Sequence, residues 1–297
     1  MLGAVSRALG RILAQPGAVI GAVLVAGLVA LAVIGPALSA KDPLAADIDR
    51  GLTALGAPMP PSADAPLGTD PLGRDVWARV IAGARTSLAI AGLATLLALV
   101  IGLAIGLIAG YAGGTVDNLL MRLVDLVLAF PFLLLAILLA ALFHRTGMAA
   151  SSRPVVITLG AVGWTTMARV IRSQALVLAR SDMVAAARAL GAGPARIVLR
   201  YLLPNVGGTV LALALVGFAQ NLLAESMLSY LGLGPAPPAP TWGRMLFEGR
   251  AYFRIAPHLV LAPGAAICLA VVAFHLLGDG LRDAVGLERP MSRGAAS

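Results

Sequence analysis

Residues 86–116 read TSLAIAGLATLLALVIGLAIGLIAGYAGGTV and carry no charged side chain. An uncharged stretch of about 18 residues or more is long enough to cross the hydrocarbon core of a bilayer as a helix. Within it, Gly102, Gly106 and Gly110 recur every four residues and so share one helix face. A stripe of small residues lets two helix backbones approach closely. We therefore expect a membrane-spanning helix whose glycine face packs against another helix.

Five other stretches lack Asp, Glu, Lys and Arg, and each predicts a further membrane span. The third span contains Pro131. The fourth should leave the lipid at Arg169 and Arg172, because arginine is costly at the bilayer centre. The five stretches are residues 12–40, 126–143, 155–168, 206–224 and 255–277.

The overall composition agrees with a multi-pass protein of the cell membrane. Hydrophobic residues make up 59% of the 297 residues and charged residues only 12%, about half the charged share of a soluble domain. Only helices and closed barrels satisfy their backbone groups in lipid, and no alternating pattern suggests a barrel. The sequence predicts an all-α integral membrane protein with about six transmembrane helices.

Changes in composition divide the chain into four parts. Residues 1–40 form a predicted N-terminal anchor helix, although Ala37-Leu38-Ser39-Ala40 also resembles a signal-peptide cleavage site. Residues 41–85 hold six prolines and six aspartates and predict an irregular extracytoplasmic segment. Residues 86–285 form the membrane domain, and residues 286–297 form a cytoplasmic tail.

The distribution of arginines predicts the orientation. Six arginines lie between Arg169 and Arg200, and Arg7 and Arg11 precede the first span. Positively charged residues concentrate on the cytoplasmic side of membrane proteins. We therefore expect both termini, and the segment between the fourth and fifth spans, to lie in the cytoplasm.

That cytoplasmic segment reads RVIRSQALVLARSDMVAAARALGAGPARIVLRYLLPN, residues 169–205. Ser181 or Asp182 can cap a helix over residues 183–190, Gly191 can end it, and Pro194 can begin the next helix. Such a helix–turn–helix is either a handle by which a soluble partner moves membrane helices or an ordinary amphipathic interfacial loop. The pattern alone leaves both interpretations open.

Part of this segment, AAARALGAGPARIVLRYLLPN, resembles the coupling-helix motif of ABC importer permeases. The matching positions are Ala185-Ala186-Ala187, Gly191 and Leu203-Pro204. The family glutamate would fall at Ala185, so this sequence departs from the motif there and lacks any polar contact of that glutamate.

Three other segments resemble dipeptide, oligopeptide and nickel permeases of the same family. The first reads LGTDPLGRDVWARVIAGARTSL, residues 67–88, and the others cover residues 110–137 and 223–246. Together the similar segments span most of residues 67–285 in the family's order, which is more specific than any single motif.

The resemblance implies a complete transport assembly. The chain would pair with a second homologous permease subunit, two ATPase subunits and an extracytoplasmic substrate-binding protein. The ATPases would bind ATP and Mg, so that this chain holds no cofactor, and would drive alternating access. The implied cargo is di- or oligopeptides first, with nickel chelates or haem as alternatives carried by the same architecture.

The resemblance also implies which residues couple to the ATPase. The coupling helix would cover about residues 182–194, between the fourth and fifth spans, and dock in a groove on an ATPase subunit. Its alanine-rich face, residues 185–189, would approach the partner closely. The coupling residues are Asp182, Ala185, Ala186, Ala187, Arg188, Leu190, Gly191 and Arg196.

A second candidate site lies before the second span, at the outer end of the expected path. Asp70, Gly73, Arg74 and Asp75 bring alternating charges within six residues. These side chains either pair with each other or contact the binding protein or the partner permease.

Several other functions are excluded or disfavoured. Lys41 is the only lysine and stands between Ala40 and Asp42, so the chain has no Walker A motif to bind ATP. The three histidines are scattered and no hydrolase motif is present, so we expect no enzyme. One cysteine excludes a multi-cysteine metal site. The net charge of +8 follows from arginines that flank spans, so we expect no nucleic-acid partner.

An ion-coupled secondary carrier is the alternative from a different class. Such carriers place ionisable residues at membrane depth and often show two repeated halves. The acids nearest the spans, Asp117, Asp125, Glu225 and Asp279, lie at span edges, and no repeat is visible. The sequence therefore favours the importer subunit.

Overall fold

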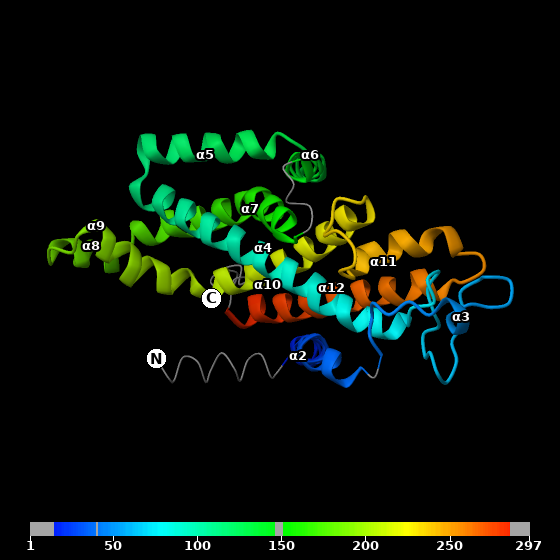
Figure 1. Ribbon diagram of the computed structural model, residues 1–297. Coiled ribbons are helices and arrows are strands. Elements are labelled where there is room, and N and C mark those ends of the chain that lie inside the picture. Colours follow the sequence, from blue (N-terminus) through cyan, green and yellow to red (C-terminus); the bar gives the residue numbers. More distant parts are fainter. Residues whose placement is uncertain (1–14, 40, 146–150, 286–297) are drawn as a thin grey trace, which may run out of the picture.

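The computed structural model describes residues 15–39, 41–145 and 151–285, and within these ranges every regular element is a helix. The expected tail, residues 286–297, and parts of the first span lie outside the described residues. The elements are α2 (Pro16–Leu38), α3 (Ile48–Gly51), α4 (Val76–Ala112), α5 (Gly114–Leu128), α6 (Phe132–Arg145), α7 (Arg153–Ala179), α8 (Asp182–Ala189), α9 (Pro194–Ile197), the π-helix η2 (Val198–Leu202), α10 (Leu203–Tyr230), α11 (Trp242–Gly249), the 3-10 helix η3 (Arg250–Tyr252) and α12 (His258–Val285) (Figure 1).

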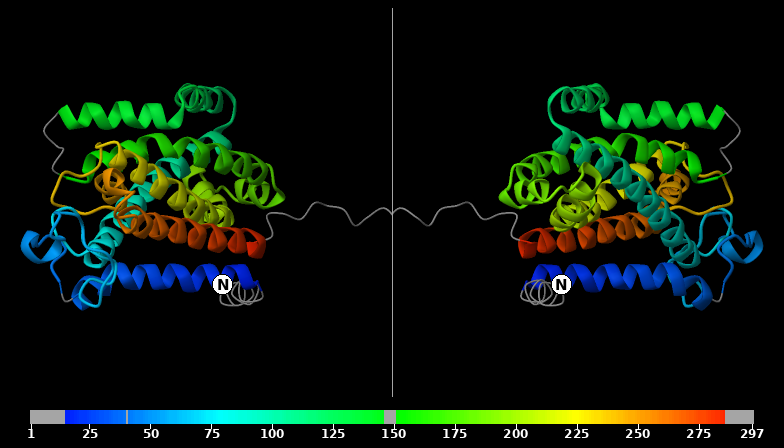
Figure 2. Two further views of the ribbon diagram at one scale, coloured as in Figure 1. Left: turned by 90° about the vertical axis from the view of Figure 1, so that its right-hand side faces the viewer. Right: turned by 90° about the vertical axis from the view of Figure 1, so that its left-hand side faces the viewer.

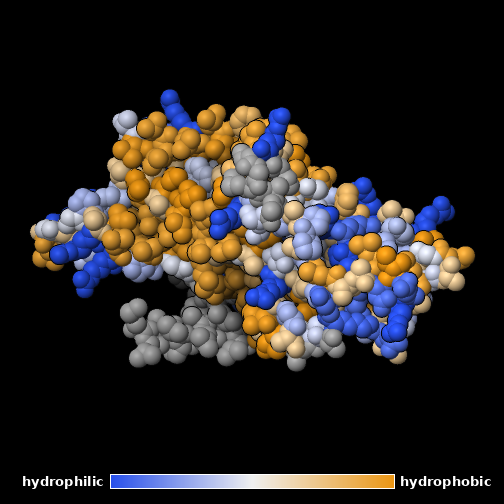
Figure 3. Space-filling view, viewed as in Figure 1, coloured by the Kyte–Doolittle hydropathy of each residue, from blue (hydrophilic) through white to orange (hydrophobic). Residues whose placement is uncertain are grey.

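The number of spans agrees with the predicted number of about six. Five helical runs are long and apolar enough to cross a membrane: α2, α4, α7, the continuous run Pro194–Tyr230 that ends with α10, and α12. The pair α5–α6, with a bend of 84° between its two helices, makes a sixth when it is counted as one span. Apolar surface covers the middle of the molecule, and polar residues gather toward its ends (Figure 3).

The helices form a bundle with two distinct ends. α4, α7, α10 and α12 occupy the middle, α2 lies along one side, and α5 and α6 lie along the opposite side (Figures 1 and 2). α8 and α9 lie at one end, here called the α8 end. α3, α11 and residues 41–75 lie at the opposite end, here called the α11 end (Figure 1).

The glycine stripe lies at the contact between α4 and α7. A Cβ atom added to Gly102, Gly106 or Gly110 would lie 2.8, 2.7 or 2.8 Å from a backbone oxygen of α7. Real Cβ atoms do not approach neighbours this closely, so only glycine permits this backbone separation. The stripe therefore fixes the distance between the two central helices.

The second span begins earlier than expected. α4 starts at Val76, so residues 76–85 belong to this helix and not to an irregular segment. The Asp75 carboxylate caps the helix by accepting a 2.8 Å hydrogen bond from the backbone N–H of Ala78. Arg79, which made these residues look polar, is buried among acids described below.

The third span is not the single helix that we predicted for residues 126–143. α5 begins at Gly114, directly after α4, and the helix breaks at the elbow formed by residues 129–131. Pro131 lacks a backbone N–H and its ring clashes with the preceding turn, which explains a break at this point.

The helix of the fourth span, α7, continues past Arg169 and Arg172 to Ala179. Both arginines pair with acids of α5: Arg172 with Asp117, and Arg169 with Asp125. Pairing reduces the cost of keeping a helical arginine close to the membrane.

Candidate functional site

The short helix α8 contacts the rest of the chain through its buried side. Val184 and Ala187 are buried, and Val184 belongs to the same apolar cluster as Ile171 of α7 and Ile197 of α9. The Arg188 guanidinium lies over the Tyr111 ring at the end of α4, 5.3 Å from its centroid. The buried side of α8 therefore shares an apolar cluster with residues of α4, α7 and α9.

The turn after α8 has the geometry of a glycine-ended helix. Gly191 adopts a φ of +81°, and its N–H donates to the Arg188 carbonyl at 2.9 Å. The N–H of Ala192 donates to the Ala187 carbonyl, also at 2.9 Å, which completes a Schellman-type end. At the other end, Ser181 does not cap with its side chain, because its hydroxyl donates to the Leu178 carbonyl.

The outward face of α8 is apolar. Met183, Ala186 and Leu190 are spaced three and four residues apart, so they share one face. All three are exposed, and Leu190 has 89% of its surface accessible. Five of the remaining predicted coupling residues are exposed as well: Asp182, Ala185, Arg188, Gly191 and Arg196.

Ala187 is the exception and corrects our prediction of one continuous alanine face. Its side chain is only 3% exposed and points toward the bundle. Of residues 185–189, only the side chains on the outward face can contact a partner. Burial depends on how the hairpin folds back onto α4 and α7, which the alanine repeat itself does not reveal.

At the α11 end, five charged side chains form what we call the outer ion cluster: Asp70, Arg74, Arg79, Arg244 and Glu248. Arg74 Nε lies 2.6 Å from Asp70 Oδ2, and Arg79 Nη2 lies 2.8 Å from Glu248 Oε2. Arg244 Nε donates to Glu248 Oε1 at 2.9 Å. Arg79 is only 2% exposed. The cluster therefore ties the start of α4 to α11.

The predicted residues Asp70, Gly73, Arg74 and Asp75 do not act together. Asp70 and Arg74 pair with each other, whereas Asp75 caps α4 and lies 3.3 Å from the Lys41 ammonium. Gly73 has a φ of +73° and fits closely against the backbone of Asp47. Sequence reasoning missed Arg79, Arg244 and Glu248; the one signal in the sequence was the aspartate-rich segment just before Arg79, and the other two residues lie far from it along the chain.

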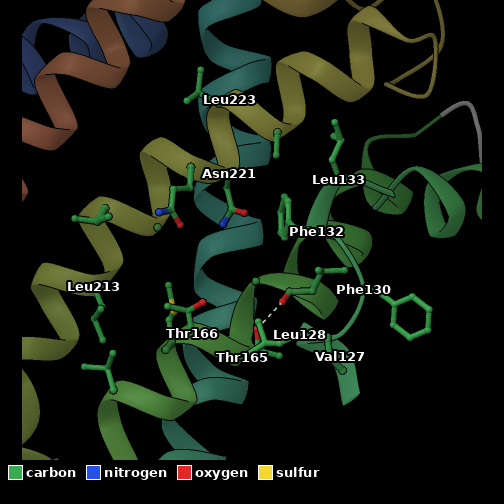
Figure 4. A pocket seen from close by; sticks show the side chains of 18 of the residues that line it. Val127, Leu128, Phe130, Phe132, Leu133, Thr165, Thr166, Leu213, Asn221 and Leu223 are labelled. Carbon is green, nitrogen blue, oxygen red and sulfur yellow. Dashed lines mark hydrogen bonds between the residues drawn. The ribbon is translucent and has the colours of Figure 1, made fainter. Parts of the chain in front are cut away.

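A cavity of about 610 Å³ lies between the elbow, α7 and α10 and reaches Arg282 of α12. Its walls are mostly apolar, with the hydroxyls of Thr165 and Thr166 and the amides of Gln220 and Asn221 among them. Figure 4 shows Asn221 and Thr166 on different walls, with Phe132 from α6 between other apolar side chains. Among the described residues that line it, no acid occurs.

Comparison with known proteins places this geometry in context. Residues 102–287 match the family described as "Binding-protein-dependent transport system inner membrane component". The chain is 35% identical to the dipeptide transport system permease protein DppC of Alkalihalophilus pseudofirmus, over 90% of this chain and 84% of the relative. It is 34% identical to the oligopeptide transport system permease protein OppC of Bacillus subtilis, with the same coverage.

Two further similarities complete the comparison. The chain is 42% identical to the glutathione transport system permease protein GsiD of Escherichia coli, over 76% of this chain and 73% of the relative. The fold resembles the MetNI methionine ABC transporter in an inward-facing conformation, with a TM-score of 0.57 and 20% identity. That match covers 69% of this chain and 95% of the other.

Proposed function

This chain belongs to the family of binding-protein-dependent transport system inner membrane components, and on that premise we propose that it is half of the translocation path of an ATP-driven importer of short peptides. The relatives named above for dipeptides, oligopeptides and glutathione share one chemical feature in their cargo, the peptide bond. This shared feature favours peptides over nickel chelates and haem.

The observation that carries the coupling role is the outward face of α8. Met183, Ala186 and Leu190 expose apolar surface at the α8 end of the molecule. The described part of the chain does not bury this surface. An apolar ridge fits a groove on a partner by the helix-in-groove mode. Arg188 and Arg196 flank the ridge and can meet acids at the rim of that groove.

The apolar cluster that includes the buried side of α8 supports transmission of movement. Val184 and Ile197 join the cluster that contains Ile171, and Arg188 lies over Tyr111. A displacement applied to α8 would reach α4 and α7 through this cluster and through the contact with Tyr111. α7 and α10 line the cavity, so the same displacement can change its shape.

The α5–α6 pair is the proposed contact with a second, homologous permease. It lies along one side of the bundle (Figure 2), and it exposes large apolar side chains on both helices, Leu119, Leu126 and Leu134 among them, and at the elbow, Phe130. A partner that covers this side would enclose the cavity between the two subunits. At the α11 end, a substrate-binding protein would deliver cargo to a surface kept rigid by the outer ion cluster.

Reconstitution tests this function. The chain would be co-expressed with its partner permease, the two ATPases and the binding protein, and placed in liposomes. We expect uptake of di- and tripeptides that requires ATP and the binding protein and is unaffected by ionophores. Uptake that collapses with ionophores and ignores ATP would indicate the ion-coupled carrier. Uptake of nickel chelate or haem without peptide would replace the cargo class.

A further inference from the structure

Polar side chains lie in the middle of two membrane helices that line the cavity. Thr166 is the central residue of α7, and Gln220 lies in the second half of α10; both are exposed to the cavity. No hydrogen bond is formed by either side chain within the described part of the chain. A polar side chain without a protein partner needs water or a ligand to bond to it.

Asn221, the next residue on α10, is oriented by a neighbouring helix. It is only 4% exposed, and its Nδ2 donates to Thr95 Oγ1 of α4 at 2.9 Å. The Thr95 hydroxyl donates in turn to the Ala91 carbonyl at 2.7 Å. Because the one hydroxyl proton is used there, Thr95 can only accept from Asn221, which must therefore present its amide nitrogen to α4.

The carbonyl oxygen of Asn221 is left on the cavity side. No donor among the described residues reaches Oδ1, and this atom is not enclosed by protein. Gly163 of α7, which also lines the cavity, lies nearby: an added Cβ there would be in ordinary van der Waals contact with Oδ1, at 3.7 Å, and with the Ala98 Cβ, at 3.6 Å. An oriented acceptor without a donor among the described residues thus lies on the cavity wall.

We propose that Asn221, oriented by Thr95, is a station at which the peptide cargo donates a backbone amide hydrogen bond during its passage, with Gln220 and Thr166 as adjacent partners. This inference rests on the proposed function. The apolar walls accept cargo side chains without selecting among them. Arg282 is the one charged residue that the described lining contributes, so the cavity suits neutral or anionic cargo and disfavours cations. The station would bind the backbone amide N–H, a group that all short peptides share.

The mundane explanation is that Asn221 only joins α10 to α4, since side-chain hydrogen bonds between helices are common in membranes. A comparison of cargo chemistry separates the two roles. The probes are a dipeptide, alanyl-alanine, and its ester counterpart, alanyl-lactate, which has the same ends but no peptide N–H. Both would be delivered by the same binding protein to the reconstituted complex. Discrimination by the binding protein then cancels between permease variants.

The measured quantity is the ratio of kcat/KM for amide cargo to that for ester cargo. We expect Asn221→Leu to lower this ratio about five- to tenfold relative to the wild type, as one lost hydrogen bond does. Thr95→Val should lower it by a smaller factor, because Asn221 stays but loses its orientation. Thr158→Val is the matched control, since it removes a buried hydroxyl that has no hydrogen-bond partner among the described residues and lies outside the cavity lining; its ratio should equal that of the wild type.

An unchanged ratio in both Asn221→Leu and Thr95→Val would overturn the inference and leave Asn221 a bond between helices. If Asn221→Leu does not assemble, Gln220→Leu changes an exposed position on the same wall; a lowered ratio supports the station and an unchanged ratio opposes it. A wild-type complex that takes up no peptide would overturn the proposed function itself, which is distinguishable from peptide uptake with an unaltered ratio.

Discussion

At the α11 end, Arg74 and Arg79 are enclosed by Asp70 and Glu248, whereas at the α8 end Arg188 is exposed on a short helix. The first arrangement satisfies its charges internally and joins two helices. The second leaves charge and apolar surface available to another molecule. The difference indicates that the α11 end is stabilised by contacts within the chain, whereas the α8 end offers a surface for binding a partner.

The largest effect at the α11 end is expected for Asp70→Asn, which changes the outer ion cluster. Arg79 is almost wholly buried and would lose one of its two acids, and breaking a buried ion pair costs about 3–5 kcal/mol. We expect a loss of about 3 kcal/mol in the free energy of unfolding. The measurement is the tryptophan fluorescence of the purified chain during unfolding in detergent. Asp49→Asn, on the exposed surface of α3, is the control and should change nothing measurable. Equal stability of the two variants would contradict the role of the cluster.

The close contact between α4 and α7, which run between the two ends, is tested by Gly106→Leu. The added side chain would collide with the Ala168 carbonyl and with Ile171, and overpacking typically costs about 1–3 kcal/mol. Gly27→Leu introduces the same side chain into α2 where an added Cβ meets nothing within 4 Å. We expect a lower unfolding midpoint in detergent for the first variant only. Similar midpoints would mean that α4 and α7 can separate without cost.

A smaller effect on stability is expected for Gly191→Ala at the α8 end. Gly191 has a φ of +81°, which alanine adopts at a cost of about 1 kcal/mol. Gly193→Ala is a close control, because Gly193 has a φ of −72° that alanine adopts readily. Hydrogen exchange of the α8 amides should quicken about fivefold in the first variant. Equal exchange rates would show that the turn tolerates a side chain.

The smallest change in stability, with the largest consequence for partners, is expected for Leu190→Asp. This side chain is 89% exposed, so stability should stay within about 0.5 kcal/mol, while co-purification of the ATPase should be lost. Leu55→Asp makes the same change at the α11 end, where Leu55 is 96% exposed, and should retain the ATPase. Retention of the ATPase by Leu190→Asp would remove α8 from the coupling interface.

The sequence predicted the number of spans and the extent of the short helix well, because both depend on local composition. An uncharged stretch must enter lipid whatever surrounds it, and Gly191 ends a helix by its own backbone freedom. Helix α8 begins and ends within one residue of the predicted range.

Features that depend on distant contacts were not predictable. Arg79 allows α4 to start early only because Glu248, 169 residues away, accepts its hydrogen bond. Ala187 is buried and Ala186 exposed although the sequence treats them alike. Pro131 was noticed, but whether a proline kinks or breaks a span depends on what packs around it. The cavity likewise needs the elbow, α7 and α10 to be placed together in space.

The pairing of α5 with α7 has a consequence for the order in which the protein is made. Asp125 and Asp117 are synthesised 44 and 55 residues before their arginines. Although α5 carries Arg122, it leaves the ribosome before the two arginines with which Asp117 and Asp125 pair, so we expect it not to pack beside the bundle until α7 follows. A cysteine at Leu119 should therefore react with an aqueous thiol reagent in ribosome-bound chains that stop before α7 emerges, and be protected once it has. The native Cys268 lies beyond both lengths and does not interfere. Protection at both lengths would show that α5 inserts alone.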